Sequence, residues 1–386
     1  LEFRRVLFRS LDASGGAAVS SLGHAHPEVL AAMHAQIDKL AYAHTGFFTS
    51  EVSETLADHL AAHAPAGLNQ VYFLSGGSEA MEAALKLARQ YFVEIGQPER
   101  TLFIARRQSY HGNTLGALAV GGNEWRRKRF APLLVDVGRV SPCYEYRDRH
   151  AQESQDAYTQ RLLQELEDKI LELGPQRVIG FCAETVVGAT AGAIPPTPGY
   201  FKGVREICDR HGILYIADEV MCGMGRTGYM YAWQRFGVKP DIMTSAKALG
   251  CGVPVGAFMM TEKVAQHSLT AGDHGTTYGG NPLACAAVEK VLDLFEEDHI
   301  IEHVREVAPY LEQRLNELAD KYDCIKERRG VGLMQGLVFD HPVGDIINRA
   351  LEKGLILINA GADIIRFVPP LVITRENVDE MIAILD

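Results

Sequence analysis

The chain has 386 residues and 47% apolar content, which is enough for two domains that each bury a core. Its net charge of −11 argues against a nucleic-acid-binding surface, and no apolar run approaches the roughly 20 residues that a membrane-spanning helix needs. Seven cysteines without a CxxC pair are typical of reduced thiols, so we expect a cytoplasmic protein.

The N-terminal part has two sections. Residues 1–10, LEFRRVLFRS, mix apolar residues with arginines but lack the continuous apolar core of a targeting peptide, and we interpret them as a non-native junction. Residues 11–45 predict a strand, a turn and a helix near Pro27, and we expect this segment to pack with a small C-terminal domain. His24 and His26 form an HxH pair, but no carboxylate or third histidine stands at ligand spacing, so we predict no metal site there.

Helical and strand patterns alternate from residue 46 to 285, which predicts a large α/β domain with a mostly parallel sheet and helices on both faces. The expected elements are a helix ending near 95, a strand at 101–105, a helix at 155–173, a strand at 178–184, a helix at 199–212 and two strands leading to Asp218 and Lys247. Residues 286–386 predict a small α+β domain. Its expected elements are helical stretches within 286–320, a strand at 332–339, a helix at 344–353, the strands LILIN and IIRFV, and a helix from Arg375.

An acid and a lysine stand at the ends of two successive predicted strands. The apolar run 213–217 stops at Asp218, and the next short run leads to Lys247. Open α/β sheets place their ligands at the carboxyl ends of strands. A lysine amine there can hold an aldehyde cofactor, while an acid can pair with the pyridinium nitrogen of pyridoxal phosphate. The alternatives are that Asp218 forms a turn or caps a helix, and that Lys247 is a solvated surface charge.

A glycine turn before a helix is the third element of the pattern. The run SGGSEAMEAALKLARQYF (75–92) predicts an amphipathic helix with Ser78 as its N-cap. Gly76 and Gly77 let backbone amides approach a ligand, and the positive end of the helix dipole favours a phosphate. The three elements together favour a pyridoxal phosphate site over the alternatives.

Seven stretches form an ordered set, at 11–29, 75–89, 109–118, 218–228, 246–257, 274–287 and 366–371. They resemble the class III pyridoxal phosphate-dependent aminotransferases of fold type I. The resemblance implies a large cofactor-binding domain with a seven-stranded, mostly parallel sheet, and a smaller α+β domain. From about residue 241 the chain is most similar to acetylornithine aminotransferases, whereas 71–235 resembles a broader group of aspartate aminotransferase-family and ω-amino-acid enzymes.

The resemblance implies that six matched residues hold pyridoxal 5′-phosphate. Their implied roles are phosphate binding by the backbone of Gly77 and Ser78, stacking by Tyr110, packing beneath the ring by Val220, pairing with the ring nitrogen by Asp218 and covalent attachment by Lys247. Asp218 and Lys247 would then be the catalytic residues.

The resemblance also implies how substrates and subunits meet. Thr277 would reach the phosphate bound by a neighbouring subunit, so we expect a homodimer with shared sites. Thr276 would lie beside the substrate, and Arg366 would bind its α-carboxylate as a planar bidentate donor. The alternative for Arg366 is an arginine on the surface at the end of a strand.

Three positions depart from the acetylornithine and ornithine enzymes. Asn113 replaces a substrate-contacting arginine, Ala189 replaces a glutamate that pairs with the carboxylate-binding arginine, and Met221 replaces a glutamine. The expected reaction is transfer of an amino group from N-acetylornithine, or a related ω-amino acid, to the keto acid 2-oxoglutarate. The alternatives are an ω-amino acid or amine:pyruvate aminotransferase, an aminomutase of the glutamate-semialdehyde type, and a weakly active cofactor-binding protein.

Overall fold

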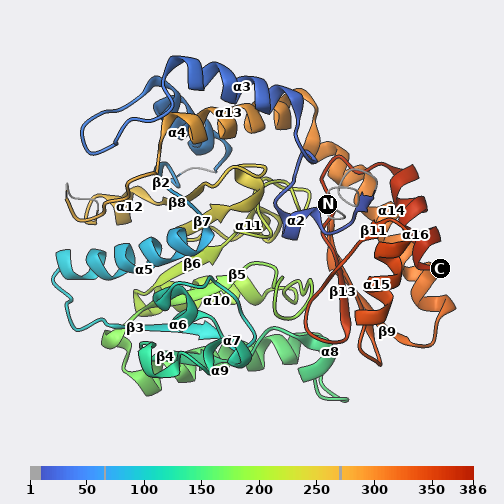
Figure 1. The fold of residues 1–386 in the computed structure, drawn as a ribbon. Helices are drawn as coiled ribbons and strands as arrows, with labels where there is room; N and C mark the ends of the chain where they lie inside the picture. The colour runs from blue at the N-terminus through green and yellow to red at the C-terminus, as the bar shows by residue number, and fades with distance from the viewer. Residues whose placement is uncertain (1–9, 65–66, 269–271) are drawn as a thin grey trace.

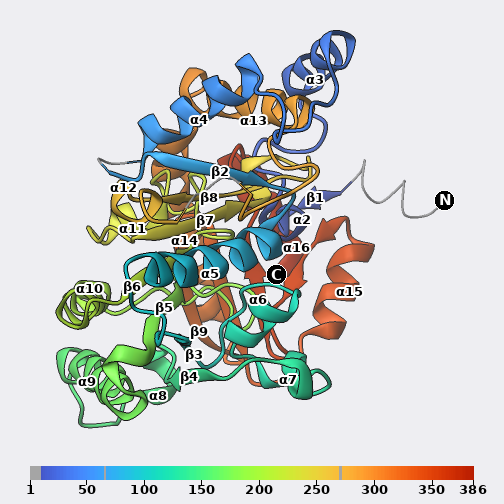
Figure 2. The ribbon, with the colours of Figure 1, turned by 90° about the vertical axis from the view of Figure 1, so that its left-hand side faces the viewer.

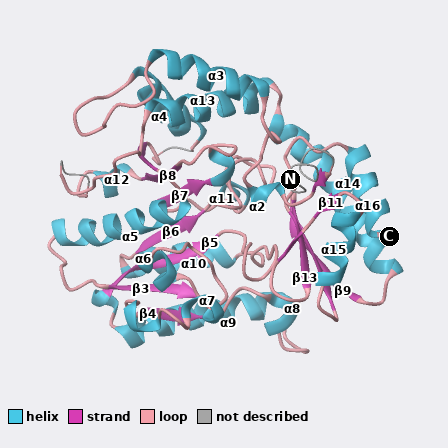
Figure 3. Cartoon of the chain, in the orientation of Figure 1, coloured by secondary structure: helices cyan, strands magenta, loops and turns pink. Residues whose placement is uncertain are grey.

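The computed structural model describes residues 10–64, 67–268 and 272–386. A seven-stranded sheet in the order β2-β8-β7-β6-β5-β3-β4 forms the centre of the larger part (Figures 1 and 3). Its strands are β2 (Gln70–Leu74), β3 (Leu102–Arg106), β4 (Val137–Val140), β5 (Val178–Glu184), β6 (Leu214–Asp218), β7 (Ile242–Ala246) and β8 (Gly256–Met260). Strand β8 runs antiparallel to both neighbours, whereas the strands from β7 to β4 are parallel. The predicted α/β class with a mostly parallel sheet is confirmed.

Helices cover both faces of this sheet. They are α5 (Gly77–Glu94), α6 (Leu115–Val120), α7 (Glu124–Arg127), α8 (Glu145–Asp148), α9 (Gln155–Leu173), α10 (Tyr200–His211), α11 (Ala232–Arg235) and α12 (Glu262–Ala265). Strand β6 shows the two faces: Leu214 and Ile216 belong to the core that contains α5, whereas Tyr215 and Ala217 belong to the core that contains α9 and α10. Every residue of β5, β6 and β7 is buried, and β5 and β6 are nearly continuous apolar runs because both faces of the sheet are covered.

The C-terminal part carries a second, antiparallel sheet in the order β12-β13-β10-β9. Its strands are β9 (Ile325–Val331), β10 (Met334–Phe339), β12 (Ile358–Asn359) and β13 (Ile364–Phe367). The helices of this part are α13 (Pro282–Glu297), α14 (Ile300–Lys321), α15 (Gly344–Glu352) and α16 (Arg375–Leu385). Helices α13 and α14 are separated at His299, whose φ of +50° interrupts the helical backbone.

The N-terminal segment contacts both parts of the molecule: Oγ of Ser21 donates to the carbonyl oxygen of Ala248 in the larger part at 3.1 Å, and the segment's strand and helices contact the C-terminal part. Its strand β1 (Leu11–Asp12) pairs in parallel with β11 (Leu355–Ile356), and its helix α2 (Gly15–Ala18) follows directly. Helices α3 (Pro27–Lys39) and α4 (Glu51–His63) pack against α13, as two perpendicular views show (Figures 1 and 2). The domain boundary that sequence analysis proposed at 285/286 falls inside α13, which is continuous from Pro282 to Glu297.

Two of the predicted strands differ from the structure, one in its first residue and one in its continuity. The strand expected at 332–339 begins at Met334, because Gly332 has a φ of +60° and a Cβ atom there would lie 2.5 Å from the Arg226 carbonyl oxygen. The strand expected at LILIN divides into β11 and β12. The proposed junction at 1–10 lies, apart from Ser10, outside the described residues. Among the described residues, no helix is both long and apolar enough to cross a membrane.

Candidate active site

A cavity of about 350 Å³ opens at the carboxyl ends of the central strands. Its walls come from the glycine turn before α5, the loop after β3, and the segments that follow β5, β6 and β7. Six of the ten predicted site residues line it: Gly77, Ser78, Tyr110, Asp218, Val220 and Lys247. The strand order thus brings together residues that are far apart in the sequence, as expected for a ligand site of an open α/β sheet.

Asp218 is held by two hydrogen bonds inside the protein. It ends β6 beside Glu184, its register partner at the end of β5. Its Oδ2 lies 2.8 Å from Nδ1 of His111, and its Oδ1 accepts from the Val220 amide at 3.0 Å. The side chains of His111 and Asp218 are both buried. The carboxylate therefore has a defined orientation.

Lys247 follows β7 directly and adopts an unusual backbone conformation. Its φ of +51° lies in the left-handed region, which residues other than glycine rarely occupy and which often marks a functional site. Burial lowers the pKa of its amine, and the charge of Asp218 partly opposes this effect. Among the described residues, no side chain forms a hydrogen bond or ion pair with its Nζ. The amine is therefore available to react and is more readily neutral than a solvated lysine.

The glycine turn places the first amides of α5 at the cavity. Sequence analysis predicted Ser78 as the N-cap, but this is wrong: the helix begins at Gly77, and Gly76 is the N-cap. Gly76 and Gly77 can enter the turn without a side chain, so the helix starts earlier than the serine suggests. A Cβ atom at Gly77 would lie 2.9 Å from Cγ1 of Val220. The first-turn amides lack intrahelical partners and can bind an anion.

Tyr110 is held at the cavity by a hydrogen bond from its backbone amide and by a cation over its ring. Its amide donates to Oε2 of Glu184 at 3.1 Å, and the other oxygen of Glu184 accepts from the Gly188 amide at 3.2 Å. Burial raises the pKa of Glu184. The guanidinium carbon of Arg126 lies 4.8 Å from the centre of the Tyr110 ring. This contact places a cation beside the predicted stacking residue.

Arg366 is buried next to the cavity without a carboxylate contact. It lies on β13, and its Nη1 donates to Sδ of Met221, a cavity residue, at 3.6 Å. Its Nε has no hydrogen-bond partner among the described residues. Burial lowers the pKa of Arg366 to about 10, while the charge of Glu184 opposes the shift. The guanidinium thus retains donors that a ligand carboxylate can use.

Three other predicted residues lie outside the cavity lining. Thr276 donates from Oγ1 to Oε1 of Glu79 in the first turn of α5, at 3.2 Å. Thr277 is exposed, and its carbonyl oxygen accepts from the Tyr42 hydroxyl at 3.0 Å. Asn113 is exposed, and its amide donates to Oγ of Ser78 at 3.1 Å. These residues surround the glycine turn rather than enter the cavity.

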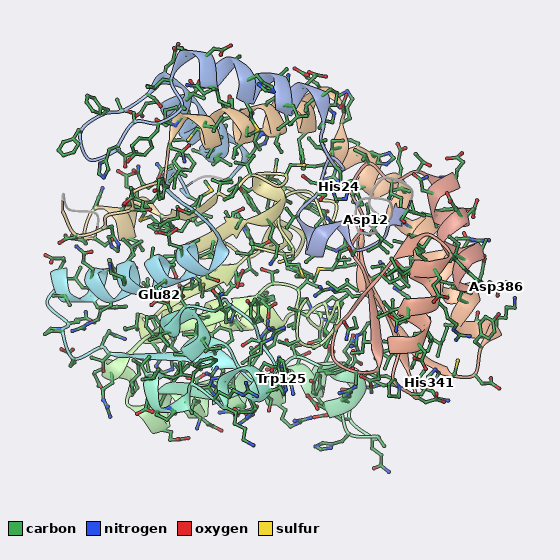
Figure 4. All side chains as sticks on the ribbon, in the orientation of Figure 1. Asp12, His24, Glu82, Trp125, His341 and Asp386 are labelled. Atoms are coloured by element: carbon green, nitrogen blue, oxygen red, sulfur yellow. The ribbon has the colours of Figure 1, made fainter. Side chains whose placement is uncertain are left out.

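Two titratable residues that line the cavity, and one surface pair, were not predicted by sequence analysis. His111 and Glu184 both line the cavity. Their signals were present: His111 follows Tyr110 directly, and the strand before Glu184 ends in an acid as the next strand does at Asp218. At the surface, Nε2 of His24 lies 2.9 Å from Oδ2 of Asp12, a carboxylate that the sequence spacing did not indicate (Figure 4).

Comparison with known proteins agrees with this geometry. The chain matches the family described as Aminotransferase class-III over residues 8–386. It is 39% identical to an uncharacterized aminotransferase of Schizosaccharomyces pombe, over 98% of this chain and 88% of that protein. It is 37% identical to an acetylornithine aminotransferase of Vibrio vulnificus, over 97% and 88%. An amine transaminase structure from an uncultivated Pseudomonas species in its PLP-bound form has a TM-score of 0.91 and 34% identity, over 97% and 89%.

The fold and the cavity define a pyridoxal phosphate-dependent transferase of fold type I. The chain belongs to the class III aminotransferases, and its cofactor is pyridoxal 5′-phosphate. The cavity residues fit this cofactor: Lys247 supplies an amine without a partner among the described residues, Asp218 supplies an oriented carboxylate, and the turn at Gly77 supplies unpaired amides.

Proposed function

We propose that the six cavity residues hold the cofactor in the roles that the family resemblance implies. Lys247 would bind its aldehyde carbon, and Asp218 would keep its ring nitrogen protonated. The α5 amides of Gly77 and Ser78 would bind its phosphate, while Tyr110 would stack on the ring and Val220 would pack beneath it. The support is the convergence of these residues around one cavity, together with the positive φ of Lys247, whose amine has no partner in the part of the chain that the structure describes.

We propose that Lys247 also moves the proton of the reaction. When bound, the cofactor supplies an electron sink next to the donor carbon. With cofactor and donor bound, Nζ of Lys247 would take the proton from the donor carbon as a base and later return it as an acid. The lowered pKa of Nζ suits this work, because a neutral amine accepts a proton.

We propose N-acetylornithine, or a related ω-amino acid, as the donor and 2-oxoglutarate as the acceptor. The observation that carries this proposal is Arg366, a buried guanidinium that has no carboxylate partner among the described residues. Arg126 adds a second cation, since its guanidinium carbon lies 4.8 Å from the ring centre of Tyr110, which lines the cavity. Two cations beside one cavity favour an acceptor with two carboxylates. The acetylornithine aminotransferase relative supports the donor.

A panel of donors and acceptors on the PLP-loaded protein tests this substrate assignment. We expect 2-oxoglutarate to be a better acceptor than pyruvate, and Arg126→Ala to reduce kcat/KM for 2-oxoglutarate more than for pyruvate. Equal use of both acceptors by the parent protein, unchanged by Arg126→Ala, would contradict the dicarboxylate assignment.

A second candidate is transfer from an ω-amino acid or amine to pyruvate. Met221 and Ala189 give the cavity apolar wall where the acetylornithine enzymes are expected to have polar residues. An apolar wall suits an amine without a carboxylate. The amine transaminase neighbour supports this alternative. In the same panel, higher kcat/KM for arylalkyl amines than for N-acetylornithine would favour it.

We propose that two chains form a homodimer with shared active sites. Phe47 and Tyr278 are 81% and 65% exposed, and Tyr278 is adjacent to Thr277, the residue expected to reach a partner's cofactor. Phe48 and Tyr42 extend this aromatic patch through ring contacts at 6.4 and 6.1 Å. Exposed aromatic clusters of this kind are typical of interfaces. Light scattering should give twice the chain mass, and Phe47→Asp should shift the protein toward monomer and weaken PLP binding.

We propose the cytoplasm as the location. All seven cysteines are free thiols, which suits a reducing compartment.

A further inference from the structure

Two histidines and three carboxylates meet where α4 packs on α13. His59 and His63 come from α4, and Glu289, Asp293 and Glu296 come from α13. We call these five residues the α4–α13 cluster. The helices are held together beneath it by a shared apolar core, so the positions of the cluster residues do not depend on their own interactions. None of the five lines the PLP cavity.

The two histidines point the same way because they stand one helical turn apart. Their rings stack with centres 5.1 Å apart and planes 25° from parallel. Histidines at positions i and i+4 of a helix are a recurring metal-binding pair. The stacking therefore aligns two imidazoles from a single helix face toward α13.

The distances to Glu296 match those of a metal site. Oε1 of Glu296 lies 3.1 Å from Nε2 of His63 and 3.4 Å from Nε2 of His59. Ligands bound tetrahedrally to zinc at 2.0 to 2.1 Å are about 3.3 to 3.4 Å apart. All three atoms lie within 4.8 Å of one another, so a single ion can reach them with small side-chain adjustments.

The other ring nitrogen of His59 has the partner that a metal-bound histidine usually has. Its Nδ1 lies 3.1 Å from Oε1 of Glu289. In metal sites, a carboxylate commonly accepts from the far nitrogen of a histidine ligand, orients the ring and increases its basicity. Asp293 is placed differently, because Nζ of Lys290 lies 3.7 Å from its Oδ2 and competes for it. The ligand set is therefore the two histidines and Glu296.

The cluster contains buried polar atoms without hydrogen bonds. Nε2 of His63 and Oε2 of Glu289 have no hydrogen-bond partner among the described residues. An ion at this position would bind Nε2 of His63, which lies 3.1 Å from Oε1 of Glu296 without forming a hydrogen bond to it.

We propose that Nε2 of His59, Nε2 of His63 and a carboxylate oxygen of Glu296 bind a divalent transition-metal ion, with Zn²⁺ the ion that best suits two imidazoles and one carboxylate. Glu296 is half exposed, so water can occupy the fourth position. The ion joins α4 to α13 and therefore stabilises the packing of the N-terminal segment on the body of the protein. The site is independent of the proposed substrate.

The test uses the full-length, PLP-loaded chain without a histidine tag, stripped with a chelator and titrated with zinc chloride. Calorimetry should give one strong site per chain, and zinc should raise Tm. Zinc X-ray absorption should show imidazole scattering from two histidines. His63→Gln and Glu296→Gln should each weaken binding at least tenfold and remove the Tm shift. Glu289→Gln should weaken binding about tenfold while keeping the two-imidazole signal, because its carboxylate only orients His59.

His34→Gln is the matched control, since His34 is an exposed helical histidine of α3 outside the cluster. It should bind zinc as the parent does. Circular dichroism and the absorbance of bound PLP establish that each variant is folded. Absence of a one-to-one zinc site, or equal binding by folded His63→Gln, Glu296→Gln and the parent, would overturn the proposal. Binding should also weaken as pH falls below neutrality, because protons compete for the imidazoles.

Discussion

Nδ1 of His111 lies 2.8 Å from Oδ2 of Asp218, and both side chains are buried. An ionised carboxylate has no proton to donate, so Nδ1 of His111 is the donor of this pair when Asp218 is ionised. The imidazole therefore orients the carboxylate that is proposed to face the cofactor nitrogen. The pair joins the loop after β3 to the end of β6, and it makes Asp218 a preorganised group rather than a strand-end turn residue.

Replacing Asp218 with Asn should reduce kcat by roughly a thousandfold or more, because the ring nitrogen would lose the charge that keeps it protonated. Steady-state kinetics and the absorbance spectrum of bound PLP provide the measurement. Asp136→Asn, at an exposed position, serves as the control. Near-parental turnover of a folded Asp218→Asn protein would mean that the carboxylate has only a structural role.

Lys247→Ala should abolish measurable transfer while the protein still binds some PLP through the glycine turn. Borohydride reduction of the parent and peptide mapping should place the pyridoxyl label on Lys247. Because burial lowers the pKa of this amine below its ordinary 10.5, covalent capture of PLP should persist at pH values where solvated lysines are mostly protonated. Lys202→Ala, an exposed lysine of α10, should behave as the parent does. A label on a different lysine contradicts the assignment.

Arg366→Ala should raise KM for 2-oxoglutarate about 30-fold, because losing a charge-assisted pair costs about 2 kcal/mol. PLP affinity should change much less, since Arg366 does not line the cavity. The measurement compares KM for the keto acid with the dissociation constant of PLP. Arg210→Ala, on the exposed side of α10, is the matched control. Parental KM values in the Arg366→Ala protein would remove this residue from the substrate site.

Glu219 should make the folded state less stable as pH rises. Burial raises the pKa of Glu219 to about 7, above the ordinary value of 4.5, despite hydrogen bonds from Ala232 and Trp233 amides. A raised pKa in the folded state means that the stabilising contribution is complete below pH 4.5 and is lost as pH rises through 7. Urea unfolding at several pH values should show a shallower decline for Glu219→Gln than for the parent or for the exposed control Glu206→Gln.

A decline that is equally steep in all three proteins would place the titration elsewhere. The difference between variants is the informative quantity, because other groups titrate over the same range and contribute equally to each protein.

Local patterns predicted much of the secondary structure. The helix expected at 155–173 and the strand expected at 178–184 are α9 and β5 with the same bounds. An apolar stripe at helical spacing and an uninterrupted apolar run are both properties of adjacent residues, so no distant contact is needed to recognise them. The N-cap of α5 was predicted two residues too late, at Ser78 instead of Gly76, because helix ends are the part of an element that a local pattern locates least well.

The sequence by itself determined the fold class, the strand-end acid and the lysine after the next strand, because these depend on local periodicity and on where an apolar run stops. Only the tertiary structure decided that His111 orients Asp218, that Arg366 contacts Met221 and that His59 meets Glu289 across 230 residues. Those contacts depend on strand order and helix packing, which bring distant side chains to one place. A local sequence pattern does not specify how far apart in space two residues lie when they are distant in the chain.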